Sequence, residues 1–173
     1  MAPTGTAISA NRARVGESAL ADKLTREVEG TVLFDSFSRG RYSTDASHYQ
    51  IEPIGVVVPK NEADIHRVIQ IATDEGIPVL PRGGGTSQCG QTIGEALVVD
   101  VSRHLNGVVD FDAEARRIVV EPGMVLDQLN RFLSPHGLMF PVDVSTAAQA
   151  TIGGMTGNNS CGARSIVHGT MRD

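Results

Sequence analysis

The chain has 173 residues, of which 40% are hydrophobic and 20% charged, a composition that suits one folded domain or two small ones and excludes wholesale disorder. Fifteen Lys and Arg residues against twenty Asp and Glu residues give a net charge of −5, whereas nucleic-acid binders usually carry a basic excess. The sequence has no apolar run of the roughly 18 residues that span a bilayer, no apolar core of a secretory signal at its start, and too few cysteines for a disulfide framework.

The N-terminal part of the chain contains one clear helix pattern. Residues 1–16 are small and polar, which predicts a loose N-terminus. Residues 34–50 are rich in Ser, Asp and Tyr without a clear period, so we expect an ordered loop there. Between these segments, apolar residues recur every four positions and predict a short amphipathic helix, at Leu20, Leu24 and Val28.

A strand–helix–strand unit is predicted between residues 54 and 80. The β-branched run at 55–58 ends at a proline and predicts a buried strand, and residues 77–80 predict a second strand. Asn61 can cap the helix between them, with Asp64 in the capping-box position. Strands joined in this way run parallel with a right-handed crossover. The helix should bury an apolar stripe, formed by Ile65, Val68, Ile69 and Ala72.

The rest of the chain predicts a third strand, a hairpin and a second helix. The strand is expected at 96–101, and residues 107–111 and 117–121 flank a polar turn typical of a hairpin. Residues 141–173 resemble a loop. Ten of the 19 glycines lie in two clusters, at 83–94 and 153–169. The second helix should span 124–136 and bury one face, made of Val125, Leu129, Phe132 and Leu133.

The first glycine cluster follows the second predicted strand, in the sequence PRGGGTSQCGQT at 81–92. Open α/β folds bind ligands at the carboxyl ends of parallel strands. Glycine permits positive φ and lets backbone N–H groups approach an anion, while Thr86 and Ser87 add hydroxyl donors and Arg82 adds a positive charge. These features predict a phosphate cradle; the alternative is a tight turn with spare glycines.

Two common nucleotide motifs do not fit this loop. The spacing from Gly85 to Thr92 matches a P-loop, but Gln91 stands where a lysine must reach the β- and γ-phosphates. The dinucleotide pattern G-x-G-x-x-G fails because its third glycine is replaced by Gln88. No helix fits between Thr92 and Ala96, so no helix N-terminus lies behind the loop. ATP or GTP hydrolysis and a nicotinamide site are therefore disfavoured.

Four motifs occur in one order along the chain: GVVVPKNEADIHRVIQIATDEGIPVLP, PRGGGTSQCGQ, VEPGMVLDQLNRFLSPHG and PVDVSTAAQATIGGMTGNNSCGARSIVHGTMRD. Together, with a further likeness in YSTDASHY at 42–49, they resemble the flavin-binding domain of the vanillyl-alcohol oxidase and p-cresol methylhydroxylase (PCMH) superfamily. Within it, the chain looks most like FAD-linked D-2-hydroxyacid dehydrogenases acting on D-lactate, glycolate or 2-hydroxyglutarate. The GNNSCGA segment is similar to long bacterial members that carry a C-terminal iron–sulfur module.

The resemblance implies a PCMH-type α+β fold. An α/β-type subdomain with a small parallel sheet would be followed by part of a second, mixed-sheet subdomain. Residues 1–50 would form an N-terminal helix and ordered loop, and residues 51–173 an FAD-binding domain that is truncated at its C-terminus and lacks the substrate domain. An iron–sulfur cluster is expected only if a longer chain carries a C-terminal module.

The resemblance also implies FAD held without a covalent bond, because members with attached flavin place a His where this chain has Thr86. For the second cluster, the alternative is a helix that begins at Thr151 with a glycine-rich packing face, and both interpretations can hold together. The expected pyrophosphate-side residues are Pro81, Arg82, Gly83, Gly84, Gly85, Thr86, Ser87, Gln91 and Thr92. The expected flavin- and ribityl-side residues are Pro141, Asp143, Thr151, Ile152, Gly153, Gly154, Gly157, Asn158, Asn159 and Ser160.

The implied reaction oxidises a D-2-hydroxyacid to the 2-oxoacid: the α-hydrogen passes to FAD as hydride, a base takes the hydroxyl proton, and a separate acceptor receives the electrons. In the family the base and any metal belong to a downstream domain, so no catalytic or metal-binding residue is assigned here. The alternative is an inactive flavin-binding fragment or partner subunit. Neither nucleic acid nor an integral membrane segment is expected, and the location would be cytoplasmic, including association with a membrane through an electron-transfer partner.

Overall fold

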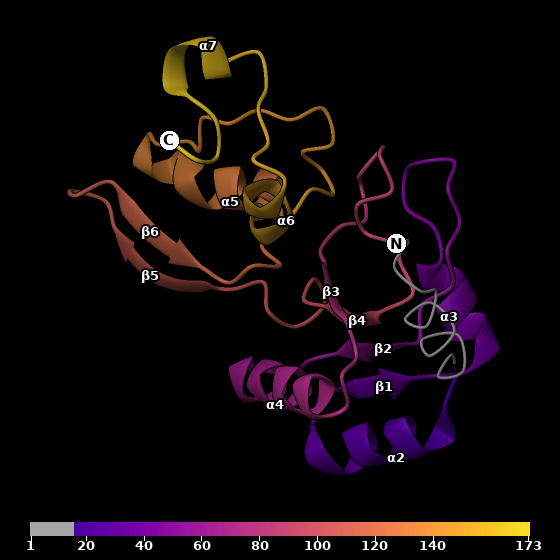
Figure 1. Ribbon diagram of the computed structural model, residues 1–173. Coiled ribbons are helices and arrows are strands. Elements are labelled where there is room, and N and C mark those ends of the chain that lie inside the picture. The colour runs from indigo at the N-terminus through magenta and orange to yellow at the C-terminus, as the bar shows by residue number, and fades with distance from the viewer. Residues whose placement is uncertain (1–15) are drawn as a thin grey trace, which may run out of the picture. The chain divides into compact units, whose positions relative to one another are not determined.

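A computed structural model describes residues 16–173, which divide into two compact units. Unit 1 ends at Asp100, and unit 2 runs from Val101 to Asp173 (Figure 1). The predicted loose N-terminus, 1–16, lies outside the described residues except for its last position. Each unit has its own sheet and its own buried clusters.

Unit 1 is built on a four-stranded sheet in the order β1-β2-β4-β3. Strands β2 and β3 both run parallel to β4, and β1 pairs antiparallel with β2 at the edge. The predicted parallel arrangement is confirmed, but the two strands of the strand–helix–strand unit are separated by β4. The elements are α2 (Ser18–Glu27), β1 (Thr31–Leu33), α3 (Ser36–Tyr42), β2 (Gly55–Val58), α4 (Glu62–Asp74), β3 (Val79–Arg82) and β4 (Leu97–Asp100).

The two central strands, β2 and β4, are buried along their whole length. Their continuous apolar sequences follow from this, since a central parallel strand is covered on both faces. Val56, Val58 and Val98 form a cluster on one face, against which Tyr42 of α3 packs. Helices α2 and α4 lie side by side on the other side of the sheet (Figure 1).

Helix α4 begins at the predicted cap, where the Asn61 side chain accepts the Asp64 N–H at 2.9 Å. Asp64 does not complete the capping box. Its carboxylate is buried and accepts the N–H groups of Glu29 and Lys60, both at 2.8 Å. The predicted stripe is partly wrong, because Ile69 is 47% exposed. The buried face is therefore rotated about the helix axis from the predicted one, and it consists of Asp64, Val68, Ile71 and Ala72.

The prediction of a loop for 34–50 is partly wrong, because this segment contains α3. The Asp35 side chain caps the helix by accepting the Ser38 N–H at 2.8 Å. The helix has only seven residues and includes Gly40, so it shows no apolar period in the sequence. It is held by its cap and by the packing of Tyr42 on the sheet, and only the first of these is a local feature.

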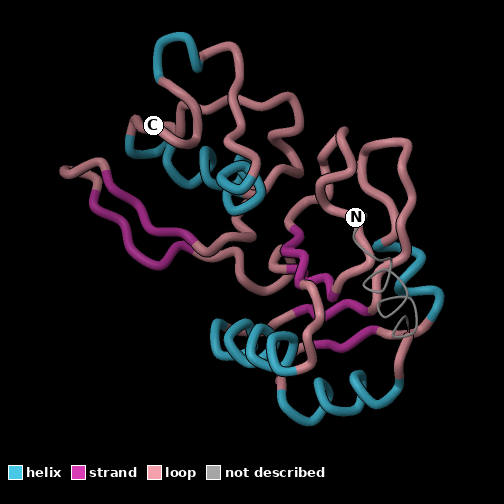
Figure 2. The backbone as a smooth tube through the Cα atoms, viewed as in Figure 1, coloured by secondary structure: helices cyan, strands magenta, loops and turns pink. Residues whose placement is uncertain are grey.

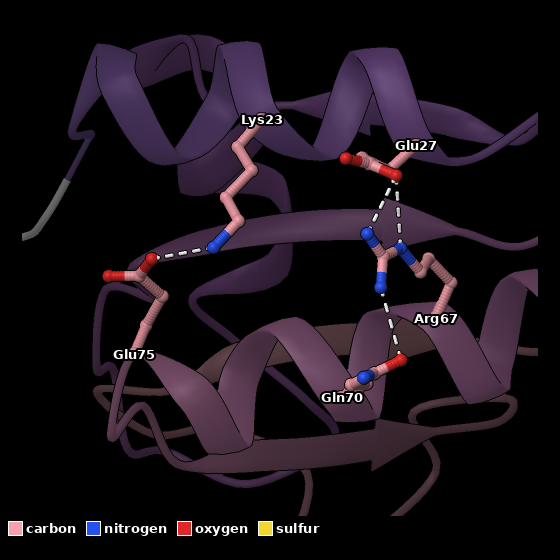
Figure 3. A network of polar contacts seen from close by, with 5 residues as sticks. All are labelled: Lys23, Glu27, Arg67, Gln70 and Glu75. Carbon is pink, nitrogen blue, oxygen red and sulfur yellow. Dashed lines mark hydrogen bonds and ion pairs between the residues drawn. The ribbon is translucent and has the colours of Figure 1, made fainter.

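Two ion pairs connect α2 and α4 on the surface of unit 1 (Figure 3). Lys23 pairs with Glu75 at 2.8 Å. Arg67 pairs with Glu27 at 2.8 Å and also donates to Gln70 at 3.0 Å. All four charged side chains are about one-third exposed, so each pair contributes no more than about 1 kcal/mol. The two helices are therefore held mainly by their buried apolar residues, including Leu24 and Val68.

Unit 2 contains the predicted hairpin and helix. The hairpin turn passes through Arg116, which has a positive φ of 53°. Its strands cover the helix residues Leu129 and Leu133, whereas Phe132, predicted to be buried, is 39% exposed. The region after residue 141, predicted as a loop, includes two short helices. The elements are β5 (Val108–Asp112), β6 (Arg117–Val120), α5 (Leu126–Leu133), the 3-10 helix η1 (Ser134–His136), α6 (Ile152–Gly157) and α7 (Ser165–His168).

The fold class expected from the sequence is confirmed: helices and strands are mixed in a small sheet-based unit followed by a second sheet-containing unit. Two details differ. The sheet of unit 1 is mixed rather than purely parallel, because β1 runs antiparallel, and the sheet of unit 2 has two antiparallel strands. Among the described residues, every helix is too short or too polar to cross a lipid bilayer.

Candidate functional site

The glycine loop, residues 83–92, leaves the carboxyl end of β3 (Figure 2). The backbone N–H groups of Gly84, Gly85 and Thr86 donate no hydrogen bond to any residue between 16 and 173. Gly85 adopts a positive φ of 65°. Successive free N–H groups next to a left-handed residue form an anion-binding concavity. The first half of the loop therefore has the donors that a phosphate group requires.

The second half of the loop is closed on itself by Ser87. Its hydroxyl oxygen accepts the N–H groups of Cys89 at 3.2 Å and Gln91 at 3.3 Å, and its O–H group donates to Gln91 Oε1 at 2.9 Å. Ser87 and Gln91, both predicted to contact the cofactor, are thus also structural partners of one another. Residues 84–86 remain the open part of the loop.

Arg82, at the end of β3, connects the two ends of the loop to a distant segment. Its guanidinium group donates to the carbonyl oxygens of Tyr42 at 3.3 Å, Thr44 at 2.9 Å and Thr92 at 3.2 Å. It also lies over the Tyr42 ring, 5.2 Å from the ring centroid. The loop and residues 43–50 consequently lie side by side (Figures 1 and 2).

Asp45 forms a second connection between these segments. Its carboxylate accepts the Thr92 hydroxyl at 3.2 Å and, at 3.5 Å, the Thr92 N–H. Partial burial acts to raise the pKa of Asp45, but hydrogen bonds from Ser47 and Thr92 outweigh it, and the pKa lies below its ordinary value. The carboxylate is therefore ionised at neutral pH. No sequence pattern indicates a role for Asp45, although its segment, 42–49, carries part of the family resemblance.

Tyr42, over whose ring Arg82 lies, is hydrogen-bonded to the last residue of β4. Its hydroxyl group donates to Asp100 Oδ2 at 2.7 Å, and Asp100 is itself buried. Burial, the hydrogen bond to Asp100 and the negative charge of that carboxylate together raise the pKa of Tyr42 to about 12. The phenol is therefore neutral and acts as a hydrogen-bond donor throughout the physiological range.

We expect the tyrosine of a Tyr49→Phe variant to titrate near pH 12. The chain has two tyrosines, so the remaining phenolate absorbance reports Tyr42 alone. The folded-state pKa of Tyr42 is raised from 10.0, so its protonated hydroxyl group stabilises the folded state. This contribution to the free energy of unfolding is complete below about pH 10 and is lost as the pH rises toward 12. Ultraviolet absorbance and circular dichroism measured together would check this. Ionisation of a still-folded Tyr42 near pH 10 would contradict the expectation.

The second glycine cluster lies in unit 2, and its first residues are held by the protein itself. Thr151 is buried and caps α6 by accepting the Gly154 N–H at 3.2 Å. The N–H of Ile152 donates to the Met124 carbonyl and that of Gly153 to the Pro122 carbonyl, both at 2.8 Å. The interpretation of this segment as a helix start with a packing face thus describes Thr151, Ile152 and Gly153.

The exposed part of this cluster follows on the same helix and the turn after it. Gly154, Gly157, Asn158 and Asn159 are exposed. Asn159 has a positive φ of 48°, and its side-chain oxygen accepts the Thr170 hydroxyl and the Arg172 N–H, both at 3.0 Å. Asn158 donates its side-chain amide to Ser160 at 3.2 Å. These four are the exposed members of the residue set predicted for the flavin and ribityl side.

Pro141 and Asp143 were predicted beside the flavin, and both are partly buried in unit 2. The Asp143 carboxylate accepts the Arg164 N–H at 2.9 Å and lies 3.9 Å from the Arg164 side chain. Its backbone carbonyl lies so close to Gly162 that a Cβ on that glycine would overlap it. Asp143 thus contacts both Gly162 and Arg164 within unit 2 and holds this segment in place.

Comparison with known proteins adds three findings. Residues 53–173 match a protein-family model described as "FAD binding domain". The chain is 38% identical over 153 residues to D-2-hydroxyglutarate dehydrogenase of Haemophilus influenzae, covering 87% of this chain and 15% of that protein. It is 36% identical over 151 residues to glycolate oxidase subunit GlcD of Bacillus subtilis, covering 85% and 32%. The chain thus spans less than a third of either relative.

The fold also recurs in a solved structure of alkyldihydroxyacetonephosphate synthase. The two superpose with a TM-score of 0.80 and 19% sequence identity, over 90% of this chain and 31% of that one. At this identity the likeness concerns the fold alone. The region matched by the family model includes both glycine clusters, together with the open N–H groups at 84–86.

Proposed function

The chain belongs to the FAD-binding domain family, and on that premise we propose that it forms the FAD-binding part of an oxidoreductase that converts a D-2-hydroxyacid to its 2-oxoacid. The relatives named as D-2-hydroxyglutarate dehydrogenase and glycolate oxidase subunit support this class of substrate. In this proposal residues 51–173 are the FAD-binding part and residues 1–50 a preceding helix and loop. The acid is of the D-lactate, glycolate or 2-hydroxyglutarate type.

One observation carries the proposal: three successive N–H groups, at Gly84, Gly85 and Thr86, have no partner among residues 16–173. A pyrophosphate offers oxygen acceptors to such a concavity, and the glycines leave room for its close approach. Thr86 replaces the histidine expected for covalent attachment, so we propose that FAD is held without a covalent bond. The exposed residues of α6 and the following turn are proposed for the rest of the cofactor.

The residues of this chain would bind and orient the cofactor. Bound FAD would supply the hydride acceptor for oxidation of the α-carbon, and a separate acceptor would take the electrons onward. We assign no base among the described residues. The groups that hold the carboxylate of the acid and remove its hydroxyl proton are proposed to lie outside residues 16–173.

A second candidate is a flavin-binding fragment or partner subunit without activity of its own. The observation that favours it is coverage, because the chain spans 15% and 32% of the two relatives. The two candidates share the FAD site and differ in turnover. Reduction of an artificial electron acceptor by the purified chain, supplied with FAD and each of the three hydroxyacids, separates them.

Titration of the purified chain with FAD and with riboflavin tests the shared part of the proposal. We expect one FAD per chain with a micromolar or lower dissociation constant, and weaker binding of riboflavin, which lacks the pyrophosphate. Flavin fluorescence and calorimetry would measure both. A folded chain that binds no FAD, or binds FAD no better than riboflavin, would contradict the proposal.

A further inference from the structure

We propose that Arg82 is a positioning residue, which holds the glycine loop in its anion-binding conformation and is not itself a ligand of the pyrophosphate. This inference rests on the proposed FAD site. A cation at the edge of a phosphate loop would ordinarily be assigned to the phosphate, since guanidinium and phosphate pair strongly. The contacts of Arg82 point to a different role.

The guanidinium group of Arg82 is already bound to the protein backbone on several sides. It donates to the carbonyls of Tyr42 and Thr44 in one segment and to that of Thr92 at the far end of the glycine loop. A single side chain thus connects the start of the loop, the end of the loop and a segment about forty residues earlier. The rigid fork of donors in arginine suits such a set of separate acceptors.

The backbone of the glycine loop also packs against this guanidinium group. A Cβ built on Gly85 would lie 2.6 Å from Arg82 Nη2 and 3.1 Å from Cζ. Gly85 is the left-handed residue between the free N–H groups of its neighbours, so its position sets the shape of the concavity. The Arg82 side chain therefore supports the part of the loop that we propose for the phosphates.

The charges around the loop agree with this role. Asp45 bonds to Thr92, and the hydrogen bonds that it accepts keep its pKa below the ordinary value, so it is ionised beside the loop. Asp100 accepts the hydroxyl of Tyr42, the residue over whose ring Arg82 lies. Each of these two carboxylates is thus bonded to a residue that Arg82 itself contacts. The N–H dipoles at 84–86 attract an anion without any contact between that anion and Arg82.

The effects of the Arg82 charge and of its fork of donors on FAD affinity can be separated by comparing Arg82→Lys with Arg82→Met. Lysine keeps the charge but not the fork of donors, and methionine keeps neither. If Arg82 is a positioning residue, both variants should bind FAD at least about 10-fold more weakly, because hydrogen bonds to three carbonyls are lost or reduced. Riboflavin affinity should not change. Arg67→Met is the matched control, since Arg67 is paired on the α2–α4 surface, and it should bind FAD like the wild type.

Each outcome of this comparison decides the question. Weak FAD binding by a folded Arg82→Lys, with unchanged riboflavin affinity, supports the positioning role when the amides of residues 42–45 also exchange faster without cofactor; a direct ligand of the phosphates would weaken FAD binding and leave that exchange unchanged. Wild-type affinity in Arg82→Lys with a loss in Arg82→Met overturns it, because the charge alone would then be sufficient. A loss of riboflavin affinity equal to that of FAD also overturns it, because the effect would not be specific to the phosphate loop.

A measurement without cofactor keeps this inference separate from the proposed function. If the wild type binds no FAD, the proposed function fails, but the support of the loop by Arg82 can still be tested by hydrogen exchange. The Thr92 amide, which bonds to Asp45, and the amides of residues 42–45 should exchange faster in Arg82→Met than in Arg67→Met. Equal exchange in the two variants would overturn the inference.

Discussion

Replacing Gly162 with alanine is expected to destabilise unit 2 by about 3 kcal/mol or more. The added Cβ would overlap the backbone carbonyl of Asp143, and main-chain atoms cannot move aside as the end of a flexible side chain can. The neighbouring contacts hold both partners in place: the Gly162 N–H donates to Ser165 Oγ at 3.0 Å, and the Asp143 carboxylate accepts the Arg164 N–H at 2.9 Å. Urea-induced unfolding measures the change in free energy.

Gly157→Ala is the matched control for this substitution. No atom lies within 4 Å of a Cβ built at Gly157, which is the last residue of α6 and has no positive φ. This variant should be neutral, or more stable by up to about 1 kcal/mol, since alanine favours helix. Equal stabilities of the two variants would contradict the argument. The expected difference would show that Gly162 is required for contact within the protein, independently of any cofactor.

Gly85→Ala should weaken FAD binding by about 10- to 100-fold. A left-handed conformation is unfavourable for alanine by about 1–2 kcal/mol. Here the φ is 65°, and the new Cβ would also lie 2.6 Å from Arg82 Nη2. Either the glycine loop or the guanidinium group must shift, and the free N–H groups at 84 and 86 would move with the loop. Titration with FAD measures the loss of affinity.

Gly76→Ala separates backbone strain from the contact with Arg82. Gly76 has a φ of 63°, close to that of Gly85, but no atom lies within 4 Å of a Cβ built there. This variant should lose about 1 kcal/mol of stability and keep the wild-type affinity for FAD. An equal loss of FAD affinity in both variants would mean that general destabilisation, and not the shape of the loop, explains the effect.

Several elements could be predicted from the sequence because their causes are local. The β-branched run of β2, the Asn61 cap of α4 and the polar turn between β5 and β6 each leave a pattern within a few residues. The two glycine clusters could be located in the same way. The sequence patterns also favoured the mixed α and β class that the structure has.

Other elements depend on partners that are distant in the sequence, and the predictions were incomplete there. Helix α3 has no apolar period and is held by the sheet that Tyr42 contacts. The position of β4 between β2 and β3 follows from pairings that are distant in the sequence, Leu97 with Gly55 and Leu97 with Val79, which no local pattern encodes. Ile71 is buried in place of Ile69 because the neighbouring elements select which face of α4 is covered.

The same division holds for the proposed cofactor site. Residue types alone indicated an anion-binding loop after β3, because the ability of Gly83–Gly84–Gly85 to present N–H groups is a property of the backbone. The role of Arg82 could not be found in this way. A guanidinium group binds whichever acceptors surround it, and here the fold brings the carbonyls of Tyr42 and Thr44 within reach. The sequence supplied the charge, and the tertiary structure decided which atoms it contacts.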